Sequence, residues 1–83
     1  MAGYQVEFSK GATKDYSRLP EQYKVLIDLA LKKISQGQQL DIKPMNGEKD
    51  AFRIRVGRYR ILYVRVEDTM LISKIAHRKD AYK

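Results

Sequence analysis

The chain has 83 residues, no cysteine, one histidine and a formal net charge of +7. This length suits a single domain over residues 1–83, and the residue counts exclude a disulfide framework, a cysteine zinc site and a multi-histidine metal centre. No stretch approaches the roughly 20 apolar residues of a membrane span, and the N-terminus lacks the apolar segment of a secretory signal, so we expect a cytoplasmic protein with no membrane partner.

The first part of the chain predicts a short strand and a short helix. Residues 4–8 alternate apolar and polar side chains, which is typical of a strand. Ser9 is the expected N-cap of a helix over about residues 10–18. The Leu19-Pro20 pair ends this helix, because the residue before a proline is disfavoured in the helical conformation.

A longer helix is predicted over about residues 21–36. An apolar stripe recurs there at helical spacing, and we expect it to pack on a sheet; its members are Tyr23, Leu26, Ile27, Ala30 and Ile34, widened by Val25 and Leu29. Gly37 suits the C′ position that ends a helix.

The second half of the chain predicts a sheet. Residues 38–50 are polar and turn-rich, with a short extended piece near residues 40–42. Strands are predicted over residues 51–56, 59–66 and 70–76, followed by a polar tail over residues 77–83. Gly57-Arg58 is predicted to be a two-residue hairpin turn, since glycine adopts the positive φ that such turns need. The fold class is therefore α+β.

The predicted hairpin fixes which side chains share a face. A two-residue turn pairs Val56 with Tyr59, Arg55 with Arg60, Ile54 with Ile61, Arg53 with Leu62 and Phe52 with Tyr63. One face is then apolar and suits a core (Phe52, Ile54, Val56, Tyr59, Ile61 and Tyr63). The other face carries Arg53, Arg55 and Arg60, with Arg55 directly opposite Arg60.

The charge of the chain is concentrated around this hairpin. Residues 51–83 carry nine basic and three acidic side chains, a net charge of +6, and residues 1–50 contribute +1. Like charges placed opposite each other destabilise a strand pair, so the opposed arginines indicate an anionic partner such as RNA. The alternatives are a solvated basic face, or arginines paired with Glu48 or Asp50.

The residues suited to chemistry are few, and they leave open metal-free RNA cleavage without a cofactor. That reaction needs a base for the 2′-hydroxyl, cations for the phosphate and an acid for the 5′-oxygen. Histidine is the side chain that ordinarily suits acid–base chemistry near neutral pH, so His77 is a candidate acid or base. Tyr82 is a candidate acid or stacking platform. The alternative roles are packing for His77, and packing or disorder for Tyr82.

The chain resembles the RelE/ParE superfamily of toxins from toxin–antitoxin pairs over nearly its whole length. The matching motifs are the opening strand that ends Val6-Glu7-Phe8-Ser9-Lys10, the Leu19-Pro20 break, Asn46-Gly47, Phe52-Arg53-Ile54-Arg55-Val56-Gly57-Arg58-Tyr59-Arg60-Ile61-Leu62-Tyr63, and Ile75-Ala76-His77-Arg78-Lys79-Asp80-Ala81-Tyr82. The resemblance implies a small β-α-α-β-β-β domain with two N-terminal helices packed on an antiparallel sheet.

The resemblance also implies an activity and its residues. RelE-like toxins cleave mRNA in the ribosomal A site by 2′-hydroxyl attack, without metal. The resemblance matches Arg60, Arg78 and Tyr82 to catalytic positions and Arg53 and Arg55 to phosphate-binding positions. From the residues themselves we add His77 to the catalytic candidates, and Arg58 and Lys79 to the candidates for RNA or phosphate binding. RelE-type proteins often carry lysines where this chain has Arg53 and Arg55. Because arginine does not release its proton, His77 becomes the candidate base.

Two other activities remain open. A ParE-like toxin would inhibit DNA gyrase by protein contact and cleave nothing, and a degenerate member would only bind RNA or antitoxin. In each case the expected partner is a cognate antitoxin, whose acidic, partly disordered segment would cover the arginines of the hairpin.

Overall fold

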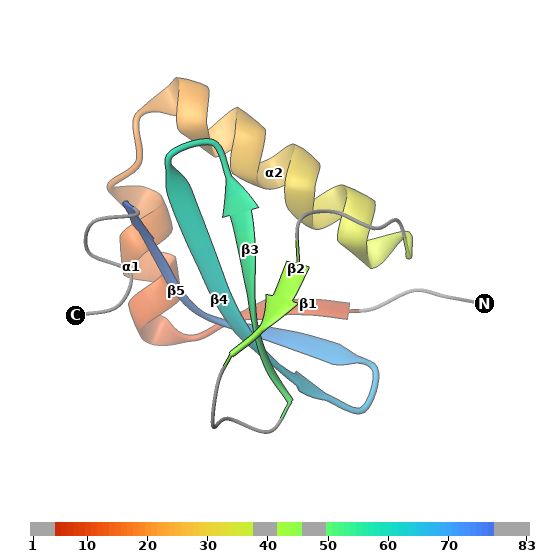
Figure 1. Ribbon diagram of the computed structural model, residues 1–83. Helices are drawn as coiled ribbons and strands as arrows, with labels where there is room; N and C mark the ends of the chain where they lie inside the picture. The colour runs from red at the N-terminus through yellow and green to blue at the C-terminus, as the bar shows by residue number, and fades with distance from the viewer. Residues whose placement is uncertain (1–4, 38–41, 46–49, 78–83) are drawn as a thin grey trace.

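The computed structural model describes residues 5–37, 42–45 and 50–77. Its elements are β1 (Gln5–Phe8), α1 (Lys10–Ser17), α2 (Glu21–Ser35), β2 (Ile42–Pro44), β3 (Ala51–Val56), β4 (Tyr59–Val66) and β5 (Thr69–His77). The strands form a sheet in the order β1-β5-β4-β3-β2, and both helices cover the same face of it (Figure 1). The predicted α+β fold is confirmed.

The sheet differs from the expected antiparallel one at both edges. β1 pairs with β5 in parallel, whereas β5, β4, β3 and β2 are antiparallel neighbours, so the sheet is mixed. Two parallel strands need a long connection, because a tight turn cannot join them. Here the chain between β1 and β5 contains both helices and the other strands. At the other edge, β2 adds a fifth strand. It begins at Ile42, and residues 40 and 41 of the predicted extended piece lie outside the described residues.

The predicted helix ends are confirmed. Ser9 caps α1, and its Oγ accepts a hydrogen bond from the Ala12 N–H at 3.1 Å. The Leu19-Pro20 pair lies between the end of α1 and the start of α2. Gly37 follows α2 with φ 80°, and its N–H donates to the Ile34 carbonyl at 2.9 Å. Glycine suits this position because positive φ costs it little.

The buried face of α2 is narrower than predicted. Ile27, Ala30 and Ile34 are buried as expected, and Leu31, which the predicted stripe omits, is buried too. Leu26 was expected in the core but is 44 % exposed, and Val25 and Leu29 are 55 % and 50 % exposed. Apolar residues surround much of α2, so more than one stripe fits the helical period. Packing against the sheet selects the stripe Ile27, Ala30, Leu31 and Ile34, spaced i, i+3, i+4 and i+7.

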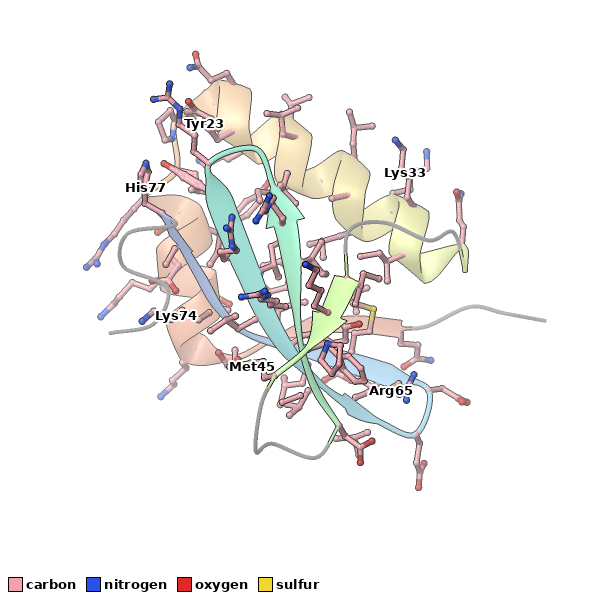
Figure 2. The ribbon with its side chains drawn as sticks, in the orientation of Figure 1. Tyr23, Lys33, Met45, Arg65, Lys74 and His77 are labelled. Atoms are coloured by element: carbon pink, nitrogen blue, oxygen red, sulfur yellow. The ribbon has the colours of Figure 1, made fainter. Side chains whose placement is uncertain are left out.

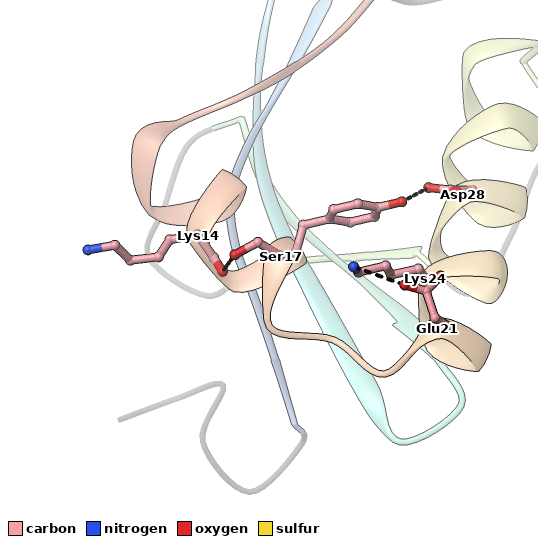
Figure 3. Close-up of polar contacts among 6 residues, drawn as sticks. Lys14, Ser17, Glu21, Lys24 and Asp28 are labelled. Carbon is pink, nitrogen blue, oxygen red and sulfur yellow. Dashed lines mark hydrogen bonds and ion pairs between the residues drawn. The ribbon is translucent and has the colours of Figure 1, made fainter.

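Hydrogen bonds connect α1 to α2 and to β5. The Tyr16 hydroxyl donates to Asp28 Oδ1 on α2 at 2.8 Å (Figure 3). This hydrogen bond, with smaller contributions from burial and nearby carboxylates, raises the pKa of Tyr16 above its usual value. On the other side of α1, Asp15 Oδ2 accepts from the Ile75 N–H of β5 at 3.0 Å. Asp15 thus accepts a hydrogen bond from a backbone N–H of β5 that lies beyond the last residue paired with β1.

The predicted β3–β4 hairpin is confirmed residue by residue. Two residues, Gly57 and Arg58, join the strands, and Gly57 has φ 58°. All five predicted pairs are present, from Val56 with Tyr59 to Phe52 with Tyr63. The β4–β5 turn has a similar length, but its positive φ of 54° falls on Glu67, a residue with a Cβ.

We expect Gly57→Ala to lower the free energy of unfolding by about 1 kcal/mol, because an L-residue is strained at positive φ. A Cβ at Gly57 meets nothing within 4 Å, so the cost is conformational. For a chain of this size the melting temperature should fall by about 4–8 °C. Glu67→Asn is the matched variant of opposite sign, since asparagine tolerates this conformation. An unchanged melting temperature for Gly57→Ala would contradict the turn assignment.

Candidate nucleic-acid interface

The sheet surface opposite the helices carries Arg53, Arg55 and Arg60, and we call it the arginine face. Arg55 pairs directly with Arg60, and Arg53 pairs with Leu62 beside them. The alternate residues Ile54 and Ile61 point to the helices and are fully buried. The sequence-predicted division of the hairpin into a core face and an arginine face is therefore present.

Two lysines extend the arginine face across neighbouring strands. Lys43 on β2 pairs with Arg53, and Lys74 on β5 pairs with Leu62. Paired residues lie on the same side of a sheet, so Lys43, Arg53 and Lys74 lie along one row across four strands. Neither lysine was among the sequence-predicted site residues. Lys43 was missed because β2 was expected only as an extended piece ending at Ile42.

Lys74 was missed because β5 contains an irregularity that strict alternation does not anticipate. The β4–β5 register shifts at Leu62/Tyr63, so Leu62 pairs with Lys74 while Tyr63 pairs with Ile72, and Ser73 is the extra residue. Ile72 and Ile75 are consequently both buried against the helices, and Lys74 joins the arginine face. The spacing of Met70, Ile72 and Ile75, which breaks the period of two, is the signal that could have revealed it.

Arg60 is the most unusual side chain of this surface. It lies on the middle strand of the sheet and is only 7 % exposed. Its Nη1 atom is buried and has no hydrogen-bond partner within the described structure. Its neighbours across the two adjacent strands are Arg55, another cation, and Ala76, which has no polar side chain. A buried guanidinium in these surroundings is poorly compensated, and an anion bound there would supply the missing acceptor.

Acidic side chains are scarce on the arginine face. The described strand residues place five cations on it (Lys43, Arg53, Arg55, Arg60 and Lys74) and one carboxylate, Glu7. Glu7 lies on β1 opposite Leu71, toward the far edge of the sheet. The face therefore favours polyanions, and a charged surface of one sign also raises the association rate of an oppositely charged partner.

His77 does not lie with the arginines. It pairs with Tyr59 on the helix-facing side of the sheet, and the two rings meet edge to face with centroids 5.7 Å apart. Tyr59 in turn meets Tyr23 of α2 at 4.9 Å. Figure 2 shows His77 near Tyr23, at the end of β5. The structure thus brings His77 into an aromatic cluster and not beside Arg60.

Of the other sequence-predicted site residues, the structure describes one. Arg58 is exposed in the β3–β4 turn. Arg78, Lys79 and Tyr82 lie outside the described residues. In the described ranges no cluster of three His, Cys, Asp or Glu side chains could hold a metal ion. The described helices are also too short or too polar to cross a membrane.

We expect Arg60→Met to raise the free energy of unfolding by about 1–3 kcal/mol, because it replaces a poorly compensated buried cation with an apolar chain of similar length. Thermal unfolding would show this as a higher melting temperature. Arg18→Met, at an exposed arginine, is the matched control and should change stability by less than about 0.5 kcal/mol. Clear destabilisation by Arg60→Met would mean that the guanidinium is well compensated in the free protein.

Comparison with known proteins identifies relatives of this chain. The family model of the ParE toxin of type II toxin–antitoxin systems (parDE) matches residues 6–82. Toxin RelE3 of Methanocaldococcus jannaschii is 32 % identical over 83 residues, which covers 94 % of each chain.

Solved structures agree with this result. The RelB–RelE antitoxin–toxin complex from Methanococcus jannaschii superposes with a TM-score of 0.70 at 32 % identity, covering 92 % of this chain and 94 % of that chain. The RelBE2 toxin–antitoxin complex from Mycobacterium tuberculosis gives a TM-score of 0.77 at 29 % identity, covering 92 % and 99 %. The chain thus belongs to the RelE/ParE superfamily of toxins from type II toxin–antitoxin systems.

Proposed function

We propose that this toxin is an endoribonuclease that cleaves mRNA on the ribosome and so inhibits translation in the cytoplasm. The observation that carries the proposal is the buried guanidinium of Arg60 within a face of cations, whose Nη1 atom has no hydrogen-bond partner in the described structure. A phosphate diester supplies the acceptor that this guanidinium lacks. Electrostatic stabilisation of a charged transition state is strongest where water is excluded and the donors are already in place.

The proposed reaction is attack of a 2′-hydroxyl on the adjacent phosphate, which releases the 5′-oxygen and leaves a cyclic phosphate. Arg60 holds the reacting phosphate, and Arg53 and Arg55 bind flanking phosphates. We assign Arg78 to the same phosphate, Tyr82 to the leaving oxygen or a stacked base, and Arg58 and Lys79 to the RNA backbone. We assign His77 a structural role, because its ring packs against Tyr59 on the helix side of the sheet.

We also propose a cognate antitoxin as the physiological partner. Two relatives that match this chain over 92 % of its length are complexes of RelE-type toxins with RelB-type antitoxins. An acidic antitoxin segment on the arginine face would neutralise the same side chains that bind RNA.

The alternative is inhibition of DNA gyrase through protein contact. It is supported by the family model that matches residues 6–82, which describes the ParE toxin. A gyrase inhibitor needs no reactive phosphate site. Removal of Arg60 would then affect gyrase inhibition only through the contact surface, and mRNA would stay intact.

Cleavage of mRNA in a translating extract, mapped by primer extension, tests the proposal. The purified toxin should produce new ends within codons, and Arg60→Ala should cleave about 10²–10³-fold more slowly, as when one transition-state donor is lost. Arg60→Ala combined with Arg78→Ala should abolish growth inhibition without unfolding the protein. Arg18→Ala, which removes an exposed arginine outside the face, should cleave normally.

Two outcomes would count against the proposal. Intact mRNA together with inhibited supercoiling would establish the gyrase alternative. Normal cleavage by a folded Arg60→Ala variant would leave an endoribonuclease whose site lies elsewhere. His77→Gln tests whether His77 acts in cleavage or only in packing. Loss of stability with cleavage retained would indicate packing.

A second prediction concerns the antitoxin. Arg53→Ala combined with Arg55→Ala should weaken antitoxin binding by at least about tenfold in calorimetry, because each truncation leaves a partner carboxylate unpaired. Arg18→Ala is again the control. An unchanged dissociation constant for the double variant would show that the antitoxin does not depend on the arginine face.

A further inference from the structure

The arginine face contains three arginines that cannot act as bases. Arginine keeps its proton at all pH values at which proteins work, whereas the ε-amine of lysine exchanges its proton. Among the five cations that the described strands place on this face, Lys43 and Lys74 are therefore the two that can accept a proton from a substrate. His77, the other candidate, lies on the opposite side of the sheet.

The position of Lys74 relative to Arg60 distinguishes it from Lys43. Arg60 pairs with Ala76, so Lys74, two residues earlier on β5, is the diagonal neighbour of Arg60. Diagonal positions lie about 7–8 Å apart, within reach of long side chains. Lys43 is separated from β4 by the whole width of β3.

Lys74 has a mixed charged environment. Arg60 and, beyond Leu62, Arg53 and Arg55 face it from β4 and β3. From α1, Asp15 reaches the adjacent Ile75 N–H at 3.0 Å, and from β1, Glu7 lies opposite Leu71. Lys74 is half-buried, and its side chain extends from the C-terminal half of β5, before His77 (Figure 2). Its flexible four-carbon stem allows the amine to adjust to a bound strand.

We propose that the ε-amine of Lys74 is the general base of the RNA cleavage reaction, an inference that rests on the proposed function. The neutral amine takes the proton of the 2′-hydroxyl while O2′ forms a bond to phosphorus. The P–O5′ bond breaks, its electron pair stays on O5′, and this oxygen takes a proton from water. The ammonium of Lys74 then returns its proton to solvent, so no other reactant is needed.

The test uses single-turnover cleavage of a defined mRNA on ribosomes with the full-length toxin, across a range of pH. Lys74→Arg keeps the positive charge but cannot accept the proton, so its maximal rate should fall about 10²–10⁴-fold with ribosome affinity unchanged. The wild-type rate should rise with pH, because only the neutral amine accepts the proton, and this rise should disappear in Lys74→Arg. Lys33→Arg, at an exposed lysine of α2 outside the arginine face, is the matched control and should keep both the rate and the pH profile.

Chemical rescue sharpens the assignment. The chain has no cysteine, so Lys74→Cys introduces a single thiol, which 2-bromoethylamine converts into a thioether analogue of lysine. The analogue should restore cleavage, and its pH profile should shift to lower pH because its amine is more acidic.

The possible failures are distinct. No cleavage by the wild-type toxin overturns the proposed function and Lys74 as base together. Wild-type rates in Lys74→Arg overturn only the assignment of Lys74. Weaker binding with an unchanged maximal rate would show that Lys74 contacts phosphate and does not take the proton. Circular dichroism and melting temperature show whether each variant is folded.

Discussion

The register of the β3–β4 hairpin is the constraint on which both the core and the candidate site depend. A turn of two residues with Gly57 at positive φ fixes every pair from Val56–Tyr59 outward. A slip of one residue would turn one strand's arginines toward the helices and expose its isoleucine, since side chains alternate with period two. Burial of Ile54 and Ile61 therefore holds Arg55 opposite Arg60 despite their repulsion. The apolar face supplies the free energy that keeps the cations together.

The sequence predicts best what local geometry decides. The cap at Ser9, the break at Pro20 and the hairpin register each follow from a few adjacent residues, and each is present. The buried face of α2 was partly wrong because its apolar residues cover more than one stripe. The irregularity at Ser73 was missed because strict alternation was assumed, and its only local sign is the spacing of Met70, Ile72 and Ile75. Two hydrogen bonds from distant residues lie beside it: the Ser9 hydroxyl, at the N-cap of α1, donates to the Ser73 carbonyl at 3.4 Å, and Asp15 of α1 accepts from the Ile75 N–H.

This irregularity and the length of β5 rearrange the candidate site relative to the sequence prediction. β5 was expected to end at residue 76, with His77 in a tail close to the arginines. The strand continues through His77, and pairing with Tyr59 fixes the imidazole on the helix side. The extra residue at Ser73 has the reverse effect on Lys74, which it places on the arginine face. As a result, Lys74 and not His77 lies on the same face of the sheet as Arg60.

Arg60 favours the proposal that this surface is a binding site over the alternative of a solvated basic face. A domain of 83 residues has a thin core and a small margin of stability, so a poorly compensated cation in the middle strand is a substantial cost. A solvated face would keep its cations extended into water, whereas Arg60 is more than nine-tenths buried. Phosphate and carboxylate both fit a guanidinium. If RNA and an acidic antitoxin segment both bind the Arg60 guanidinium, each excludes the other directly. Inhibition of the toxin then requires no change in its fold.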